Sequence, residues 1–282
     1  MTDPAGTGEH VPTIDLSRPS VARVYDLALG GKDNFAIDRQ AYEKLVELAP
    51  EIPTWARDNR KWLARVVSWL SQKERIGQFL DLGSGLPTAQ NTHQIAQAHR
   101  LDAKVVYVDN DPIVIRHGMA LLVENKYTDF AAADFTQPEQ VLNTPQVKSM
   151  IDFDRPVGVI EALMLHHIAD LDETRRIAAA YVDAIPSGSY VAMSHVCNPR
   201  DGSELAKATD ALEERFHESW GSLTFRTPAE ITSLFDGLDL IGPGLVPLFE
   251  WMPPGTQPED DQDATLPSNA SHILYAGVAR KP

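Results

Sequence analysis

Short apolar runs alternate with amphipathic stretches from residue 76 to about residue 195. Runs this short have the length of buried strands, and the stretches between them repeat apolar residues with helical spacing. Strands that alternate with helices in this way predict an α/β fold with a doubly wound, mostly parallel sheet. The predicted strands are 79–82, 104–108, 130–133, 157–162 and 190–195, and the predicted helices are 88–99, 111–125 and 171–184.

Both ends of the chain depart from this alternation. Residues 1–15 are predicted to be a flexible polar tail, and residues 16–75 show helical spacing alone, which predicts helices outside the sheet. After a short helix that starts at residue 227, the last apolar runs follow one another without a crossover helix, and such strands pair antiparallel. The domain over 76–282 is therefore predicted to hold seven strands, including a C-terminal antiparallel hairpin. Its last strands are 238–241, 245–251 and 272–279.

The composition limits the expected partners and compartment. The formal net charge is −15, which argues against nucleic acid or an anionic membrane as the main partner, since binding either needs clustered Lys and Arg. Cys197 is the only cysteine, which fits a reducing compartment. No apolar run approaches the ~20 residues of a membrane span, and no signal-peptide pattern is present. We therefore expect a soluble, cytoplasmic protein.

The glycine-rich turn after the first predicted strand carries the strongest chemical signal. Gly83 and Gly85 let the backbone approach a ligand closely, and Ser84 lies between them. A dinucleotide fingerprint would place a third glycine at position 88, where this chain has Thr88. Asp81, just before the turn, would repel a pyrophosphate and attract an ammonium group. The turn therefore favours a cofactor with an ammonium group and without phosphate.

Acidic residues follow the second and third predicted strands. Asp109, beside Asn110, is predicted to accept hydrogen bonds from both hydroxyls of a ribose. Asp134 is predicted to accept one from the amino group of adenine, with Phe135 offering its backbone N–H and its ring, although Asp134 could instead cap the following turn. S-Adenosyl-L-methionine combines an ammonium group, a ribose diol and an adenine without phosphate, and it is the predicted cofactor.

With these residues the chain resembles the class I, Rossmann-like S-adenosylmethionine-dependent methyltransferases. More narrowly, it is similar to an actinobacterial S-adenosyl methyltransferase family that was once a domain of unknown function. The narrower resemblance rests on residues 17–35, which include Gly-Gly-Lys-Asp-Asn-Phe, and on residues 79–88 and 108–112. It extends over nearly the whole chain.

This resemblance implies that the N-terminal helices over 16–75 form a lid over the cofactor. In such a lid, Gly31 could place a backbone amide close to the ligand and Lys32 could pair with the methionine carboxylate. Tyr25 could add a hydroxyl or a ring face. The alternative is that Gly30 and Gly31 simply end a helix and that Lys32 is a solvated surface residue.

Candidate catalytic residues follow the fourth and fifth predicted strands. His166 and His167 come soon after the fourth strand and His195 ends the fifth, and an imidazole can take a proton near neutral pH. Each histidine has an alternative role as a packed or hydrogen-bonded core residue. Glu161 is placed in the cofactor site, either facing the methyl group or capping the next helix. No set of converging metal ligands can be identified.

The leading hypothesis is a methyltransferase that acts on a small molecule. The Asn/Asp-Pro-Pro-Tyr/Phe signature of amino-group methylation is absent after the fourth strand. One alternative is a non-catalytic protein that binds the cofactor for sensing or stability. Another is an NAD-dependent oxidoreductase, which Thr88 and Asp81 disfavour. Tryptophans recur every seven residues at positions 55, 62 and 69 and are expected to pack in the core rather than line an acceptor pocket.

Overall fold

A computed structural model describes residues 14–88, 90–123, 125–220, 223–256 and 272–282 of the chain. It confirms the predicted parallel sheet: five parallel strands lie in the order β3-β2-β1-β4-β5. Each begins and ends within two residues of its predicted bounds, because buried apolar runs mark strands clearly. The five are β1 (Gln78–Leu82), β2 (Lys104–Asp109), β3 (Thr128–Ala132), β4 (Gly158–Ala162) and β5 (Tyr190–Val196).

The C-terminal strands extend the sheet antiparallel, as predicted. Strand β8 (Leu274–Arg280) pairs antiparallel with β5 along its whole length. The opposite edge of β8 pairs antiparallel with both β6 (Asp239–Leu240) and β7 (Val246–Pro247). The sheet therefore has eight strands, which matches the eight predicted ranges but not the seven strands expected for the domain, and the two shortest share one edge. The predicted strand 245–251 keeps only two strand residues, since the chain then turns into η3 (Leu248–Glu250).

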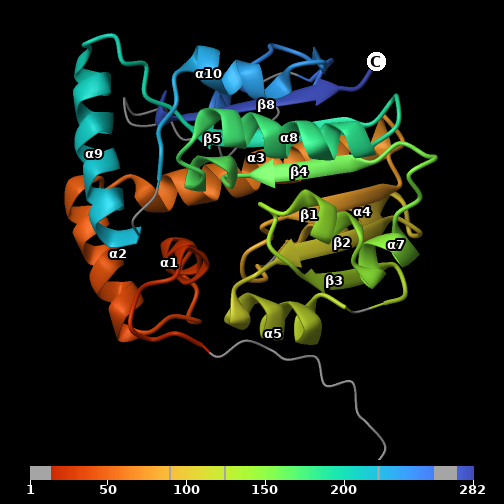
Figure 1. Cartoon of the computed structure of the whole chain (residues 1–282), viewed down its shortest axis with the longest axis horizontal. Coiled ribbons are helices and arrows are strands. Elements are labelled where there is room, and N and C mark those ends of the chain that lie inside the picture. The colour runs from red at the N-terminus through yellow and green to blue at the C-terminus, as the bar shows by residue number, and fades with distance from the viewer. Residues whose placement is uncertain (1–13, 89, 124, 221–222, 257–271) are drawn as a thin grey trace, which may run out of the picture.

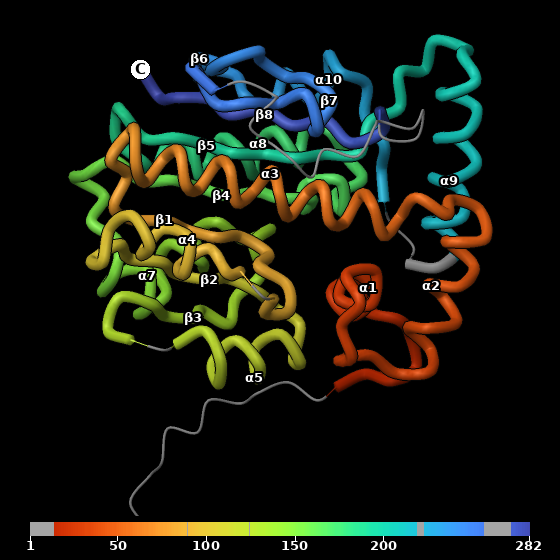
Figure 2. Tube along the Cα trace, turned by 180° about the vertical axis from the view of Figure 1, so that it is seen from behind, coloured from red at the N-terminus to blue at the C-terminus, as the bar shows by residue number. Residues whose placement is uncertain are grey.

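Helices cover both faces of the sheet. Figures 1 and 2 show the long helix α3 crossing one face and α8 the opposite face. Successive residues of β1 point to opposite faces, so Phe79 packs in the core beside α3 and Leu80 in the core beside α8. The first core also holds α4 and α5, and the second holds α6, α7, α10 and η2. The bounds are α3 (Ile52–Gln72), α4 (Thr92–His99), α5 (Pro112–Leu121), α6 (Pro138–Leu142), α7 (Pro145–Met150), α8 (Leu171–Ala184), α10 (Pro228–Thr232) and η2 (Ser233–Phe235).

Three helices lie beyond the carboxyl ends of the parallel strands (Figure 1). They are α1 (Val21–Ala28), α2 (Ala36–Leu48) and α9 (Glu204–Trp220), and α9 packs against α2. Helix α9 was missing from the predicted elements, as were the short helices α6 and α7. Its buried positions Ala206, Thr209 and Leu212 recur every three residues, but a polar member and a strongly acidic exposed face weaken the apolar pattern.

The three tryptophans of α3 are buried, which confirms their predicted core role. Trp62 and Trp69 pack edge-to-face on Trp251, with ring centroids 6.4 and 6.3 Å apart, and Trp55 is buried nearer the start of the helix. This packing fixes α3 against η3 and the residue that follows it. Within the described part of the chain, no helix is long and apolar enough to span a membrane. The predicted tail over 1–15 falls almost wholly outside the described residues.

Candidate functional site

The glycine turn after β1 has the geometry of a ligand cradle. Gly83 and Gly85 have φ angles of +63° and +65°, in the left-handed region that favours glycine. A Cβ at Gly83 would lie 2.1 Å from the side chain of Met164, whereas a Cβ at Gly85 would meet no atom within 4 Å. The buried Ser84 hydroxyl has no partner. An open approach at Gly85 beside an unused hydroxyl fits the predicted cofactor, which needs close backbone contact there.

Asp81 lies at the end of β1, directly before this turn, and its side chain is 5% exposed. One carboxylate oxygen accepts a hydrogen bond of 2.6 Å from the Thr92 hydroxyl at the start of α4. Burial raises the pKa of Asp81 to about 6, against the opposing effects of Thr92 and of the positive charge of Arg60. A cationic ligand group beside this carboxylate would hold it ionised.

Asp109 joins the glycine turn to the loop after β2. Its Oδ2 accepts from the Gly85 backbone N–H at 2.9 Å and its Oδ1 from the Asp111 N–H at 2.9 Å. Burial raises its pKa to about 6, although these hydrogen bonds favour the charged form. Asn110 is exposed beside it. The fold thus brings together the turn and the acid that the sequence analysis assigned to one cofactor.

Asp134 and Phe135 follow β3 at the same edge of the sheet. Asp134 Oδ1 accepts from the backbone N–H and the hydroxyl of Thr136, at 2.9 and 2.8 Å. This is the turn-capping alternative, but no described residue donates to Oδ2, which leaves that oxygen for a ligand. The Phe135 carbonyl accepts a 2.7 Å hydrogen bond from the Tyr181 hydroxyl of α8, which anchors this loop to the helix layer.

Glu161 is a buried acid with an unmet hydrogen bond. It lies on β4, its side chain is 2% exposed, and its Oε2 has no partner. Burial raises its pKa to about 8, so the side chain is mostly protonated at neutral pH. Its charge, when present, also acts on Tyr181 of α8. The fold therefore places Glu161 on the same side of the sheet as the Asp134–Phe135 loop.

The fold brings together the three predicted catalytic histidines. The His166 ring lies 4.3 Å from that of His167 and 5.5 Å from that of His195. His195 Nδ1 lies 2.6 Å from the Val196 carbonyl and must donate to it, and its Nε2 accepts from Arg226 at 3.1 Å. Burial lowers the pKa of His195 to about 3. Both of its ring nitrogens are occupied, so no lone pair is free to take a proton.

His166 is the member of this group with an unused ring nitrogen. It lies in η1 (Leu165–His167), it is buried, and its Nδ1 has no partner. Burial and the neighbouring histidines hold its pKa well below the usual range, so the ring stays neutral. His167 is half-buried beside it.

Arg226 is a buried residue that sequence reasoning missed. Its guanidinium donates to the carbonyls of Leu165 and Ile168 at 3.2 and 2.6 Å, and to the Thr174 hydroxyl at 2.8 Å. With its bond to His195, it ties η1 to α8 and β5 and sets the path of the chain after β4. No spacing or composition signal marks such a residue, because its partners are far apart in sequence.

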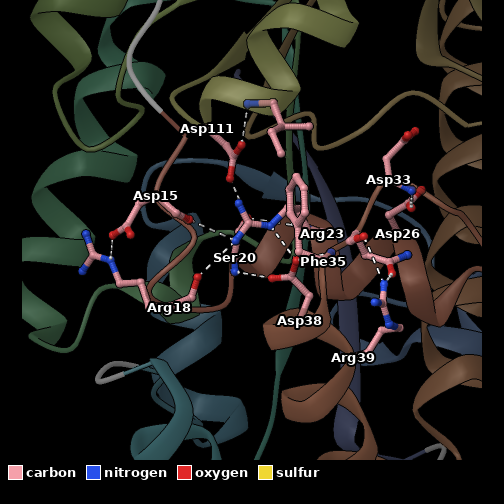
Figure 3. A network of polar contacts seen from close by, with 12 residues as sticks. Asp15, Arg18, Ser20, Arg23, Asp26, Asp33, Phe35, Asp38, Arg39 and Asp111 are labelled. Atoms are coloured by element: carbon pink, nitrogen blue, oxygen red, sulfur yellow. Dashed lines mark hydrogen bonds and ion pairs between the residues drawn. The ribbon is translucent and has the colours of Figure 1, made fainter.

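The N-terminal region is held to the sheet by a network around Arg23 (Figure 3). Arg23 forms a buried ion pair of 2.8 Å with Asp38, whose other oxygen accepts from the Ser20 N–H at 3.0 Å. The Ser20 hydroxyl donates to Asp111 at 2.5 Å. The Asp111 N–H in turn donates to Asp109, so the network connects the N-terminal region to the predicted ribose-binding acid.

Gly30 and Gly31 form a helix end, which was the alternative interpretation. The N–H of Gly30 donates to the Leu27 carbonyl and that of Gly31 to the Asp26 carbonyl, the pattern of a Schellman motif. Neither amide is available to a ligand in this arrangement. Gly31 is required because a Cβ there would lie 2.0 Å from the Asp26 carboxylate. Lys32, next in the chain, is exposed.

Tyr25 belongs to a buried chain of hydrogen bonds between α1 and the sheet. Its hydroxyl donates to the Ala56 carbonyl at 3.1 Å and accepts from Asn59 at 3.0 Å. The Asn59 amide oxygen accepts from the Ser194 hydroxyl of β5 at 2.7 Å, and that hydroxyl accepts from the Leu163 N–H at 3.0 Å. The Tyr25 hydroxyl is thus committed to α3, and its ring alone remains for a ligand.

Known families and structures resemble this chain along nearly its whole length. A family model described as S-adenosyl methyltransferase matches residues 7–282. A "putative methyltransferase" from Thermobifida fusca YX is 41% identical, with a TM-score of 0.85, and the match covers 95% of this chain and 96% of that one. A DUF574 family protein from Streptomyces avermitilis MA-4680 is 33% identical, with a TM-score of 0.86, covering 96% and 100%. No curated protein matches.

A more distant structure shows the fold alone. An O-methyltransferase family 2 protein from Planctomyces limnophilus DSM 3776, in complex with apigenin, is 15% identical with a TM-score of 0.50. The match covers 91% of this chain and 66% of that one.

Proposed function

Because this chain belongs to the S-adenosyl methyltransferase family, we propose that it is an active enzyme that transfers a methyl group to a small molecule. Its cofactor is S-adenosyl-L-methionine, which supplies an electrophilic methyl group on a sulfonium when bound. This cofactor sets aside the dinucleotide-dependent alternative from the sequence. The named substrate class and the catalytic activity itself are our proposal.

One observation carries the proposal: Asp109 accepts the N–H of Gly85, at the point where the turn is open. This bond holds a carboxylate and an unobstructed glycine side by side, as a bound adenosyl group requires. We assign Asp109 to the ribose hydroxyls, and Asp134 Oδ2 with the Phe135 N–H to the adenine. Asp81 and the unused Ser84 hydroxyl then serve the amino-acid end.

Positioning is the main source of rate enhancement that we assign to these residues. A displacement at an activated methyl group gains most from alignment of the nucleophile, and a general base adds less. His195 is assigned a structural role, since both ring nitrogens are engaged. His166 keeps a neutral, unpartnered Nδ1 and is our candidate for a hydrogen bond from the acceptor, with His167 as its neighbour. The lowered pKa of His166 makes it a weak base, so we assign it orientation before proton transfer.

A small-molecule acceptor is supported by the surface charge and by the helices beyond the sheet. The net charge of −15 opposes approach of nucleic acid. Helices α1, α2 and α9 stand at the carboxyl ends of the strands (Figure 1), where the acceptor must arrive, and a small acceptor can be enclosed between such helices and the sheet.

Methyl-labelled cofactor tests this function. The protein is incubated with the labelled cofactor and separately with small-molecule, protein and nucleic acid fractions, as well as with a panel of phenols, amines and carboxylic acids. We expect label in the small-molecule fraction and in one class of the panel. Label in protein or nucleic acid alone would refute the proposed acceptor class, and tight binding without any transfer would support the non-catalytic alternative.

A further inference from the structure

Arg60 reaches from α3 to the loop that follows the glycine turn. It is half-buried, and its Nη2 donates to the Thr88 hydroxyl at 2.9 Å and to the Gln90 carbonyl. Its guanidinium therefore lies at the start of the connection to α4, beside Thr88. A dinucleotide fingerprint would have its third glycine at this position.

The same guanidinium is within electrostatic range of Asp81. Its charge lowers the pKa values of Asp81 and Tyr25, against the dominant effect of burial. The described residues include no ion pair between these two groups, and Asp81 accepts from Thr92 instead. No described residue accepts a hydrogen bond from Nε or Nη1 of Arg60. The Arg60 guanidinium and the Asp81 carboxylate thus lie near the same turn without contacting each other, and each can form a further hydrogen bond with a ligand.

We propose that Arg60 binds the carboxylate of the cofactor's methionine moiety, with Asp81 taking its ammonium group. This inference rests on the proposed cofactor site. A separated guanidinium and carboxylate complement an amino-acid zwitterion, and the planar arginine fork matches a carboxylate better than a lysine does. Arg60 thereby recognises the amino-acid half of the cofactor, while Asp109 and Asp134 recognise the adenosine half.

Lys32 is the earlier candidate for this carboxylate, and its surroundings differ from those of Arg60. Lys32 is exposed, and the adjacent Asp33 pairs with His117 of α5 at 3.5 Å. Helix α5 begins just after Asp109, so the contact of Asp33 with this helix puts the segment beside Lys32 nearer the proposed ribose site. Arg60 instead contacts the loop after the glycine turn, on the side of Asp81.

Truncated ligands separate this role from a purely structural one. S-Adenosylhomocysteine carries the amino-acid group, and 5′-methylthioadenosine has the same adenosyl thioether without it. Calorimetry measures both ligands on the full-length wild-type protein and on the Arg60→Gln, Arg60→Lys and Lys32→Gln variants. We expect Arg60→Gln to lower the affinity for S-adenosylhomocysteine by about 10- to 100-fold, because that is the contribution of a charge-assisted hydrogen bond. Binding of 5′-methylthioadenosine should change by less than about twofold.

Two control variants distinguish carboxylate binding by Arg60 from a purely structural role. Arg60→Lys should give a smaller loss for S-adenosylhomocysteine, and Lys32→Gln should match the wild type for both ligands. Equal loss of both ligands in Arg60→Gln and Arg60→Lys would overturn the inference, since it would show that Arg60 only shapes the loop. A loss confined to Lys32→Gln would also overturn it. A wild-type protein that binds neither ligand would contradict the proposed function instead.

Discussion

The carboxyl groups around the site differ in whether protein groups donate hydrogen bonds to them. Asp81 and Asp109 accept hydrogen bonds, and burial raises their pKa values to about 6. Glu161 has an unpartnered oxygen, and burial raises its pKa to about 8. The first two can therefore stay ionised near neutral pH for an ammonium group and a ribose, whereas Glu161 remains a neutral acid that can donate.

Glu161 predicts a specific dependence of stability on pH. The folded pKa exceeds the unfolded one, so the stabilising effect of its protonated form is complete below about pH 4.5 and falls as the pH rises toward 8. Substitution Glu161→Gln removes this titration. Urea unfolding of both proteins measures this effect. Between pH 5 and pH 8, the free energy of unfolding should fall by about 3 kcal/mol more in the wild type than in the variant. Equal losses would contradict a buried neutral Glu161.

Substitution of Asp109 is predicted to weaken cofactor binding. In Asp109→Asn, the amide cannot accept both the Gly85 and the Asp111 N–H groups and also serve the ribose, so affinity for S-adenosylhomocysteine should fall about tenfold or more. Calorimetry measures the change. Asp102→Asn is the matched control, because Asp102 is exposed after α4. Similar affinities in the two variants would remove Asp109 from the site.

Buried ion pairing joins the N-terminal elements to one another. Arg23 of α1 and Asp38 of α2 are 3% and 0% exposed, and Asp38 also accepts from the N–H groups of Ser20 and Phe35. The pair thereby connects the segments on both sides of α1, which end at Ser20 and Phe35. The N-terminal helices then contact the start of α5 through the hydrogen bond from Ser20 to Asp111.

Asp38→Ala should destabilise this unit strongly. The substitution leaves the Arg23 guanidinium buried without its carboxylate, which costs about 3–5 kcal/mol in free energy of unfolding. Arg18→Ala removes an exposed pair with Asp15 and should cost less than about 1 kcal/mol. Urea unfolding of both variants checks the difference. If Asp38→Ala cost no more than Arg18→Ala, the pair would not hold the N-terminal helices in place.

The elements that apolar periodicity defines were predictable, and those that depend on distant contacts were not. Helix α8 has its predicted bounds, Leu171–Ala184, because one strong apolar stripe marks it. Helix α9 was missed because its stripe includes the buried Thr209. Among site residues, Gly85 and Asp109 stand out in local sequence, whereas Arg60 and Arg226 act through partners that only the folded chain brings near.

At the scale of the whole molecule, the N-terminal helices contact the site through two separate chains of hydrogen bonds. One runs from Ser20 to Asp111 beside the ribose side. The other runs from Tyr25 through Asn59 to Ser194, at the end of β5. Since the first chain ends beside Asp109 and the second near the carboxyl end of β5, we propose that α1 and α2 close over the cofactor as a lid.

Hydrogen exchange tests this lid. Binding of S-adenosylhomocysteine should slow amide exchange in α1 and α2 as well as at the glycine turn, because ligand contacts reduce local opening. Exchange measured by mass spectrometry with and without the ligand gives the comparison. Protection confined to the turn and the loop after β2, with unchanged exchange over residues 16–48, would show that these helices are no lid.

The site at the carboxyl ends of β1, β2 and β3 is the centre of this account. Calorimetric titration of the purified wild-type protein with S-adenosylmethionine, S-adenosylhomocysteine and NADH tests it most directly. We predict saturable binding of both adenosyl ligands at one site per chain and no heat from NADH. Saturable NADH binding without a response to either adenosyl ligand would contradict the account.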